Sequence, residues 1–186
     1  MKLSIIALAV MATSSAAMAD INLPKQDKSG VGVHAGFSVL SGDIGTIAAN
    51  YGDSTGLSLG LEYTTKNGII FGLMHTPELA SAKDTYYYYS SYSETAAFEV
   101  STTSVYVGYE TDKGLRITGG LTKATLDAKL YNNIGDSVSG SDDSIAPNFG
   151  IGYQFKNGIY ADGRIAFMDL VGVSNTQGTA SIGYKF

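Results

Sequence analysis

The sequence predicts an all-β chain that folds as an eight-stranded antiparallel up-and-down transmembrane β-barrel. Three observations lead to this prediction. Apolar residues alternate with small or polar residues along most of the chain, which is the period of a strand with two different faces. A motif typical of a strand end followed by a turn occurs three times. Only 16% of the residues are charged, yet no apolar run approaches the roughly 20 residues that a membrane helix needs.

The alternation is clearest in the first strand. From Val31 to Val39 every second residue is apolar, and the residues between them are glycine, histidine or serine. The same period is found at Leu57–Tyr63 and at Phe149–Phe155. Applied to the whole chain, the pattern predicts eight strands, at about 30–40, 55–65, 69–76, 96–111, 115–129, 145–155, 159–168 and 177–186.

Three short turns are predicted at one end of these strands. Tyr63–Gly68, Tyr109–Gly114 and Tyr153–Gly158 share one plan, at intervals of 46 and 44 residues, or about two strands and a longer loop. Asn67-Gly68 can take the positive φ values of a two-residue hairpin, whereas Gly114 suits a short bulged turn. The turns therefore predict sequential strands that pair with their neighbours.

Four longer loops are predicted at the other end, at 41–54, 77–95, 130–144 and 169–176, and helical signals are nearly absent. An even number of strands with short turns on one side and long loops on the other is typical of a barrel in a bacterial outer membrane. Closure is required there, because an open sheet edge cannot exist in lipid.

The first segment has the pattern of a secretory signal. Lys2 precedes the apolar run Leu3–Met11, which is too short to span a bilayer, and Ala17-Met18-Ala19 supplies small residues for a signal peptidase. We predict a cleaved signal peptide at 1–19, a periplasmic N-terminal lead at 20–29 and the barrel at 30–186. The expected location is the cell outer membrane, reached through the periplasm.

Composition excludes several classes of function. There is no cysteine and there are two histidines, which argues against disulfides, thiol chemistry and a histidine-rich metal site. Without Lys2, 11 basic residues face 17 acidic ones, a net charge of −6. Nucleic acid is therefore not an expected partner, because phosphate binding needs a basic stripe. No cofactor and no bound metal are expected.

The charges decide which face of the strands points inward. Six charged residues fall on the face without the large apolar side chains, at similar distances from the turns: Glu62, Glu110, Arg116, Asp162, Arg164 and Lys185. A soluble lipocalin-like barrel would need a far more charged exterior. A membrane barrel keeps its charges in the lumen and pairs them. We expect both arginines to pair with Glu62, Glu110 and Asp162.

The fifth predicted strand contains a conflict. Leu115, Ile117 and Leu121 share one parity, but beyond Thr122 the apolar residues, from Ala124 to Leu130, have the opposite parity. Either a bulge inserts one residue or the strand has left the bilayer at this point.

With these features the chain resembles the small outer-membrane β-barrels of the OmpA, OmpX and Ail type. In that family the C-terminal pattern polar-x-Gly-x-x-hydrophobic-x-aromatic is the signal that the barrel-insertion machinery recognises. Thr179, Tyr184 and Phe186 occupy three of its places, while Ser181 stands where the family has glycine. The resemblance implies that this machinery, outer-membrane lipid and lipopolysaccharide are partners, and that the protein is a monomer.

Catalysis is not expected. Outer-membrane lipid A deacylases resemble this architecture and use a His-x-Ser pair, but His34 is followed by Ala35-Gly36 and His75 by Thr76-Pro77. A narrow channel for small solutes remains an alternative. Eight strands leave an interior that side chains can fill, and we interpret the glycines on the inner face as relief of crowding.

The predicted loops favour envelope integrity or surface recognition as the function. They are strongly acidic: Lys83 stands against Asp43, Asp53, Glu78, Asp84, Glu94, Asp136, Asp142, Asp143 and Asp169. Such loops disfavour heparin-like polyanions, which family adhesins with basic loops can use, and permit cationic partners. The candidate surface patch is Tyr86, Tyr87, Tyr88, Tyr89 and Tyr92. These tyrosines either form a contact patch, or extend two strands above the membrane, or thicken the aromatic girdle.

Overall fold

The structure is a computed structural model that describes residues 29–89 and 92–186. The predicted signal peptide and all but the last residue of the predicted lead lie outside the described residues. The elements are β1 (Gly30–Gly42), α2 (Asp43–Tyr51), β2 (Gly52–Asp53), β3 (Thr55–Thr64), β4 (Ile69–Tyr89), β5 (Tyr92–Glu110), β6 (Leu115–Asn132), β7 (Ser137–Gln154), β8 (Ile159–Leu170) and β9 (Val173–Lys185).

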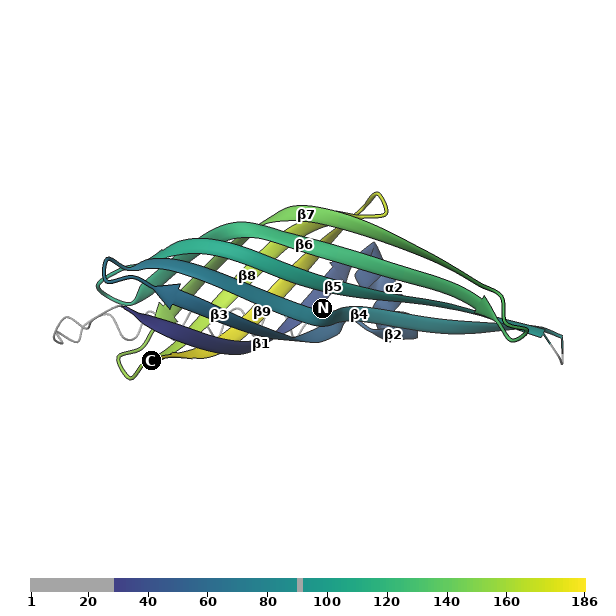
Figure 1. The fold of residues 1–186 in the computed structure, drawn as a ribbon, viewed down its shortest axis with the longest axis horizontal. Helices are drawn as coiled ribbons and strands as arrows, with labels where there is room; N and C mark the ends of the chain where they lie inside the picture. The colour runs from purple at the N-terminus through teal and green to yellow at the C-terminus, as the bar shows by residue number, and fades with distance from the viewer. Residues whose placement is uncertain (1–28, 90–91) are drawn as a thin grey trace.

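Eight of these strands form a closed antiparallel barrel (Figure 1). Each long strand pairs with its neighbours along the chain, and β1 closes the barrel by pairing with both β3 and β9. The two-residue β2 only adds to the side of β4. The predicted eight-stranded barrel is therefore confirmed. Within the described part of the chain, no helix has the length and apolar character to cross a membrane.

The three short turns lie at one end, as predicted, but their backbone differs from the expectation at Asn67-Gly68. In each turn the glycine N–H donates to the carbonyl three residues earlier, as from Gly68 to Thr65. Gly68, Gly114 and Gly158 have positive φ, whereas the residues that precede them do not. All three are thus turns that end in a left-handed glycine rather than two-residue asparagine-glycine turns.

At the opposite end, two of the four predicted long loops are mostly strand. β4 and β5 continue as a hairpin to residues 89 and 92, and β6 and β7 continue to residues 132 and 137. A register shift between Thr76 and Ala80 accommodates Pro77, since bulges tolerate proline. The predicted loop at 169–176 is a tight turn around Val171 and Gly172, both with positive φ.

These longer strands form a projection. In Figure 1, β4 to β7 run past the ends of the other strands as a tapering, curved sheet. We call this part, residues 80–89, 92–100, 126–132 and 137–142, the projecting sheet. Its backbone groups are paired across all three strand interfaces, which explains how segments without an apolar period remain extended.

The remaining predicted loop, 41–54, contains the helix α2. Ile44 and Ala48, one turn apart, are buried, and the Asn175 side-chain carbonyl accepts a hydrogen bond of 3.1 Å from the Ile44 N–H. A nine-residue helix is marginal by itself. Contacts with β1, β4 and β9 therefore stabilise the helix, which its own sequence would not hold.

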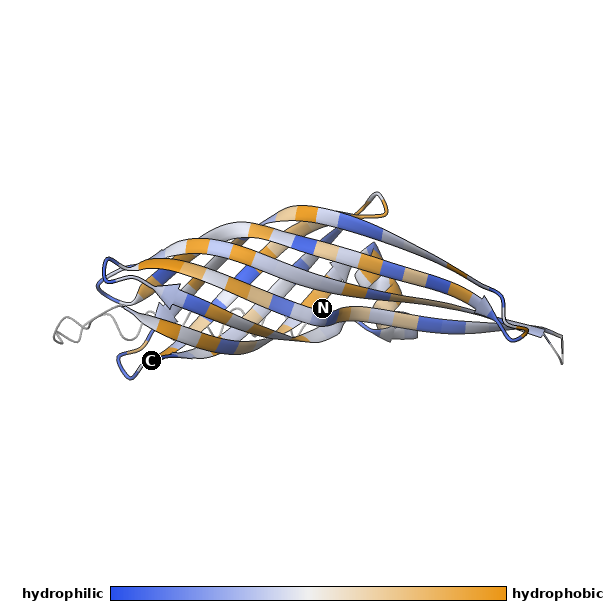
Figure 2. Cartoon of the chain, in the orientation of Figure 1, coloured by the Kyte–Doolittle hydropathy of each residue, from blue (hydrophilic) through white to orange (hydrophobic). Residues whose placement is uncertain are grey.

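The large apolar side chains of the barrel wall are exposed on its outer surface. In Figure 2, hydrophobic residues alternate with less hydrophobic ones along the strands. On β7 the outward positions Tyr153, Ile151, Phe149, Pro147 and Ile145 cover nine residues, close to the length of a transmembrane strand. The parity conflict in β6 involves no bulge, because its pairing with β5 and β7 is continuous. The strand has instead left the lipid, and its apolar residues turn inward.

Candidate functional site: the barrel interior and the projecting sheet

The six charged residues predicted for the lumen all lie on the inward face of the strands, near the end with the short turns. Arg116 is fully buried and donates 2.6 Å hydrogen bonds to both carboxylate oxygens of Glu62. It also bonds Asp162 at 3.1 Å. Lys185 pairs with Glu110 at 2.9 Å. We call these residues, with Arg164, the charge network. It holds three acids and three bases and is neutral in sum.

Two pairings differ from the expectation. Glu110 bonds Lys185 rather than an arginine. Arg164 stacks on the Tyr106 ring, 3.6 Å from its centroid, and donates to the Asn148 side-chain carbonyl at 3.2 Å. The Tyr106 hydroxyl in turn lies 3.0 Å from His34 Nε2. Aromatic faces therefore stabilise a cation that we expected carboxylates to hold.

Glycines on the inner face make room for these side chains. A Cβ at Gly72 would lie 2.0 Å from Cζ of Tyr106, and one at Gly60 would lie 2.1 Å from Nε2 of His34. Each glycine thus accepts a ring from a neighbouring strand. The inner glycines relieve crowding and leave no open pore at these positions.

Gly72→Ala is therefore expected to destabilise the barrel by about 1–3 kcal/mol, the usual cost of overpacking. The buried Tyr106 ring would have to move, and with it the contacts to Arg164 and His34. Urea unfolding would measure the change in stability, with the fraction of folded barrel read from its migration in unheated gels. Gly178→Ala is the matched control, because no atom lies within 4 Å of its added Cβ. Equal stability of both variants would contradict this packing.

Hydroxyl and amide groups lie farther from the short turns. Ser38 bonds Ser58 and Thr179, both at 2.6 Å, and Ser58 bonds Thr76 at 2.7 Å. Gln177 donates to Ser38 in this group, and on β5 to β7 Ser104 and Asn148 both bond Thr122 in a second group at the same level. We call the two groups together the hydroxyl belt. Our sequence analysis missed it, although its members share the inward parity and lack apolar character, which was a usable signal.

An apolar cluster fills the interior at the end nearest the projecting sheet. Its buried members are Leu40, Ile44, Ala48, Leu79, Ala80, Val100, Ala124, Leu126, Ala146, Ala166, Met168 and Leu170. Phe98, Ala128 and Val173 pack against it. Since α2 contributes Ile44 and Ala48 to this cluster, the helix is part of the packed plug that closes this end of the barrel. From the short turns toward the projecting sheet, the interior therefore contains first the charge network, then the hydroxyl belt and then the apolar cluster.

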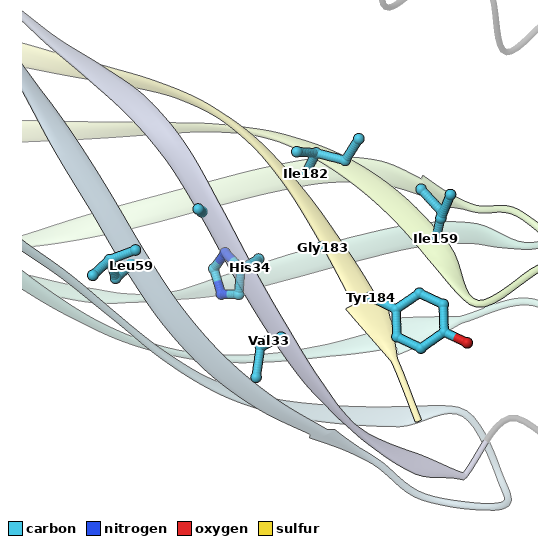
Figure 3. Close-up of a pocket in the computed structure, with 8 residues that line it drawn as sticks. Val33, His34, Leu59, Ile159, Ile182, Gly183 and Tyr184 are labelled. Atoms are coloured by element: carbon cyan, nitrogen blue, oxygen red, sulfur yellow. The ribbon is translucent and has the colours of Figure 1, made fainter.

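A shallow hollow on the outer wall measures about 430 Å³. Figure 3 shows its lining, in which Val33, Leu59, Ile159 and Ile182 come from four adjacent strands. Ala35 pairs with Leu59 on one side and Ile182 on the other, so the small side chain leaves a depression between larger ones. The depression belongs to the apolar surface that faces lipid.

The candidate tyrosine patch lies near the tip of the projecting sheet. Tyr86–Tyr89 end β4 and Tyr92 begins β5, so these residues extend the strands and do not thicken the girdle. Tyr87 is 80% exposed. The rings of Tyr88 and Tyr92 lie 5.8 Å apart, and both hydroxyls donate to Glu94, at 3.2 and 2.6 Å. This hydrogen bond to Glu94 raises the pKa of Tyr92, so the phenol remains a neutral donor.

The loop carboxylates do not converge. Asp143 accepts a 2.6 Å hydrogen bond from Thr125 and pairs with Lys123 at 2.9 Å, and these contacts, the first above all, lower the pKa of Asp143. Asp142 accepts instead from the Val171 N–H in another turn. Across residues 29–89 and 92–186, no group of three or more His, Asp or Glu side chains is placed to hold a metal ion.

The residues of the predicted assembly signal divide between two faces. Thr179 points inward and belongs to the hydroxyl belt. Tyr184 and Phe186 point outward, and their rings meet edge to face at 5.0 Å. Phe186 is 75% exposed, so its side chain contributes little to the packing of the barrel.

Comparisons with known proteins agree with this geometry. Residues 5–186 match the family model described as outer membrane protein beta-barrel domain. No curated protein sequence matches the chain. Among solved structures, Ail, the attachment invasion locus protein of Yersinia pestis, crystallised with the heparin analogue sucrose octasulfate, aligns with a TM-score of 0.60 at 16% identity, over 85% of this chain and 97% of Ail.

Two membrane-embedded structures show the same fold. Ail of Yersinia pestis in a phospholipid bilayer nanodisc aligns with a TM-score of 0.55 at 15% identity, over 85% of this chain and 99% of that chain. The outer membrane protein AlkL in lipid bilayers gives a TM-score of 0.52 at 13% identity, over 90% and 96%. With nearly the whole sequence matched by the family model, the chain belongs to the outer-membrane protein β-barrel family.

Proposed function

We propose that this protein is a non-enzymatic surface-recognition protein, in which the barrel anchors a rigid projecting sheet outside the cell. The observation that carries the proposal is the sheet itself. Short turns of outer-membrane barrels face the periplasm and long hairpins face the exterior, so β4 to β7 carry their exposed tyrosines outward. Binding residues mounted on a stable scaffold are a common arrangement.

A role in envelope integrity is part of the same proposal. The apolar outer wall, with Phe37 70% and Ile151 63% exposed, favours lipid and lipopolysaccharide as partners of the barrel itself. A monomer is sufficient for this role, because a closed barrel leaves no unpaired edge in the membrane. Outward-facing Tyr184 and Phe186 support contact with the barrel-insertion machinery.

The channel alternative is disfavoured by the packing of the interior. Arg116 and Tyr160 are fully buried near one end, and Leu79, Val100 and Leu170 are fully buried near the other. A solute would have to displace both the charge network and the apolar cluster. Refolded protein in planar bilayers should therefore show no stable single-channel conductance, and steady unitary currents would support the channel instead.

The acidic surface favours a partner different from the ligand seen with Ail. Ail was crystallised with a heparin analogue, a polyanion. On this chain the Lys123 ammonium pairs with Asp143, and the Lys83 ammonium lies over the Tyr131 ring at 5.9 Å. Acidic residues outnumber these cations in the segments beyond the barrel. Repulsion would oppose a polyanion, whereas cationic surfaces would be attracted.

The tyrosine patch provides the test. Replacing Tyr86 to Tyr89 and Tyr92 by serine should abolish adhesion or aggregation that the protein confers on cells, because tyrosine supplies most of the contact area. Heat-modifiable migration in gels should remain, since the barrel stays closed. The matched control replaces the same residues by phenylalanine and should retain most of the adhesion. Unchanged adhesion in the serine variant would contradict the proposal.

A further inference from the structure

The inner face of the projecting sheet, the side that continues the barrel interior, is apolar and uncovered. It begins at Phe98 and Ala128, which pack against the apolar cluster. Toward the tip it continues through Leu130, 47% exposed, and Val138, 71% exposed, which are direct cross-strand partners. The apolar surface that fills the barrel mouth thus extends beyond it into water, where exposed apolar patches commonly mark interaction sites.

Aromatic side chains of the other two strands share this face. Tyr86 stands opposite Glu94 in the pairing of β4 with β5, and Tyr88 contacts both Glu94 and Tyr92. Tyr86 and Tyr88 are each more than half exposed. The inner face therefore offers tyrosine rings near the tip and aliphatic side chains closer to the barrel.

Among the described residues of the sheet the lysines lie on the outer face only, whereas acidic residues lie on both faces. Asp84, Glu94 and Asp142 lie at inward positions, by their pairing with the strands beside them. Lys83, Lys123 and Lys129 all lie at outward positions, where Lys123 pairs with Asp143 and Lys83 covers Tyr131. On the described part of the inner face, acidic residues are thus accompanied by no basic residue.

We propose that the inner face of the projecting sheet binds a basic, partly apolar polypeptide segment. This inference rests on the surface-recognition function proposed above and names the chemistry of its partner. Apolar side chains of the segment would pack on Phe98, Leu130 and Val138, and its lysine or arginine side chains would pair with Asp84 and Glu94. Charge-assisted hydrogen bonds to carboxylates are stronger than neutral ones.

The charge of the face decides between this partner and other occupants. A second copy would bring the same acidic inner face, and lipopolysaccharide and other polyanions would bring further negative charge, so repulsion opposes each of them. Glu94 already accepts two tyrosine hydroxyls, which hold the carboxylate in place. A carboxylate has about four acceptor positions, so Glu94 can still accept from a cation.

The test uses the full barrel in nanodiscs of zwitterionic phosphatidylcholine and a fluorescent peptide of four Lys-Leu repeats. Fluorescence anisotropy would report binding, with empty nanodiscs as the baseline. Asp84→Asn with Glu94→Gln removes two charges from the inner face. The matched control, Glu99→Gln with Asp127→Asn, removes two charges from the outer face of the same sheet, where these residues are direct partners.

The inner-face variant is expected to weaken peptide binding by roughly tenfold, which corresponds to about 1.4 kcal/mol, and the outer-face variant by less than about twofold. Leu130→Ser with Val138→Ser should also weaken binding, as should a Lys-Ser peptide with the same charge. Folded migration in gels would verify each variant. If the inner-face and outer-face charge variants lost the same amount of peptide affinity, the attraction would be non-specific, and the proposal would be overturned.

Failure of this inference can be separated from failure of the proposed function. If the Lys-Leu peptide does not bind but the tyrosine-to-serine variant loses adhesion, the partner chemistry is wrong and surface recognition stands. If the tyrosine variant retains adhesion, surface recognition is contradicted whatever the peptide does. Binding of a Glu-Leu peptide as tight as that of the Lys-Leu peptide would also overturn the assigned chemistry.

Discussion

Replacing Arg116 by alanine is expected to destabilise the folded barrel by about 3–5 kcal/mol, the range typical of a broken buried ion pair. The guanidinium is fully buried and bonds Glu62 and Asp162 at once. It also lies over the Tyr160 ring, 4.0 Å from its centroid. Without it, two carboxylates remain in a poorly solvated interior with their main partner removed. The shift of the urea unfolding midpoint in detergent or vesicles would measure the loss.

The same strand supplies a matched control. Lys123 pairs with Asp143 at 2.9 Å, but both side chains are more than half exposed. Exposed pairs contribute about 0–1 kcal/mol, so Lys123→Ala should change the midpoint little. A large effect of Lys123→Ala together with a small effect of Arg116→Ala would show that the inward assignment of the charge network is wrong.

A second variant distinguishes lost pairing from general loss of packing. If uncompensated charge is the cause, adding Glu62→Gln to Arg116→Ala should restore part of the lost stability, because the strongest stranded charge is removed. If lost packing is the cause, the two substitutions should simply add. Their coupling energy in a double-mutant cycle separates these cases. Arg116→Lys should be intermediate, because lysine keeps the charge but cannot bond Glu62 and Asp162 with two separate nitrogens of a planar group.

The membrane-spanning half of the fold was predictable because lipid imposes a simple rule. Most outward residues there are apolar, so the outward parity of Leu115 and Ile117 on β6 also places Arg116 inward. In the same way Ile165 on β8 places Arg164 inward. Strand pairing then follows from the repeated turns. Individual pairings were not predictable in the same way. Lys185 meets Glu110 only because the barrel closes, and one-dimensional parity does not say which inward residues lie at the same height.

The outer half was predictable only in part, because its surroundings change from lipid to water. Above the bilayer, outward residues face water, so the apolar residues of β6 from Ala124 to Leu130 turn inward without any change in register. The tip of β4 and the serine-rich start of β7 lack the period of a strand, and pairing with their neighbours keeps them extended. Helix α2 depends on Asn175 and on apolar neighbours distant in sequence.

Phe149→Lys is expected to destabilise the barrel by about 2–4 kcal/mol, the cost of a cation at the middle of the lipid-facing band. Phe149 is the central of the five outward residues of β7 between Tyr153 and Ile145 and is 57% exposed on the outer wall. Its neighbours across the strands, Gly119 and Ile165, offer no partner for a charge. Urea unfolding in lipid vesicles, where the bilayer is present, is the suitable measurement.

Ser141→Lys, on the same strand and with the same outward parity, should change stability by less than about 0.5 kcal/mol, as is usual for surface substitutions. Ser141 lies on the projecting sheet and stands directly opposite Asp127, so a lysine there would face water and an acidic neighbour. The contrast between the two variants locates the boundary where lipid ends along β7. If Ser141→Lys were as costly as Phe149→Lys, the projecting sheet would lie within the membrane, and its inner face could not be a surface for partners in water.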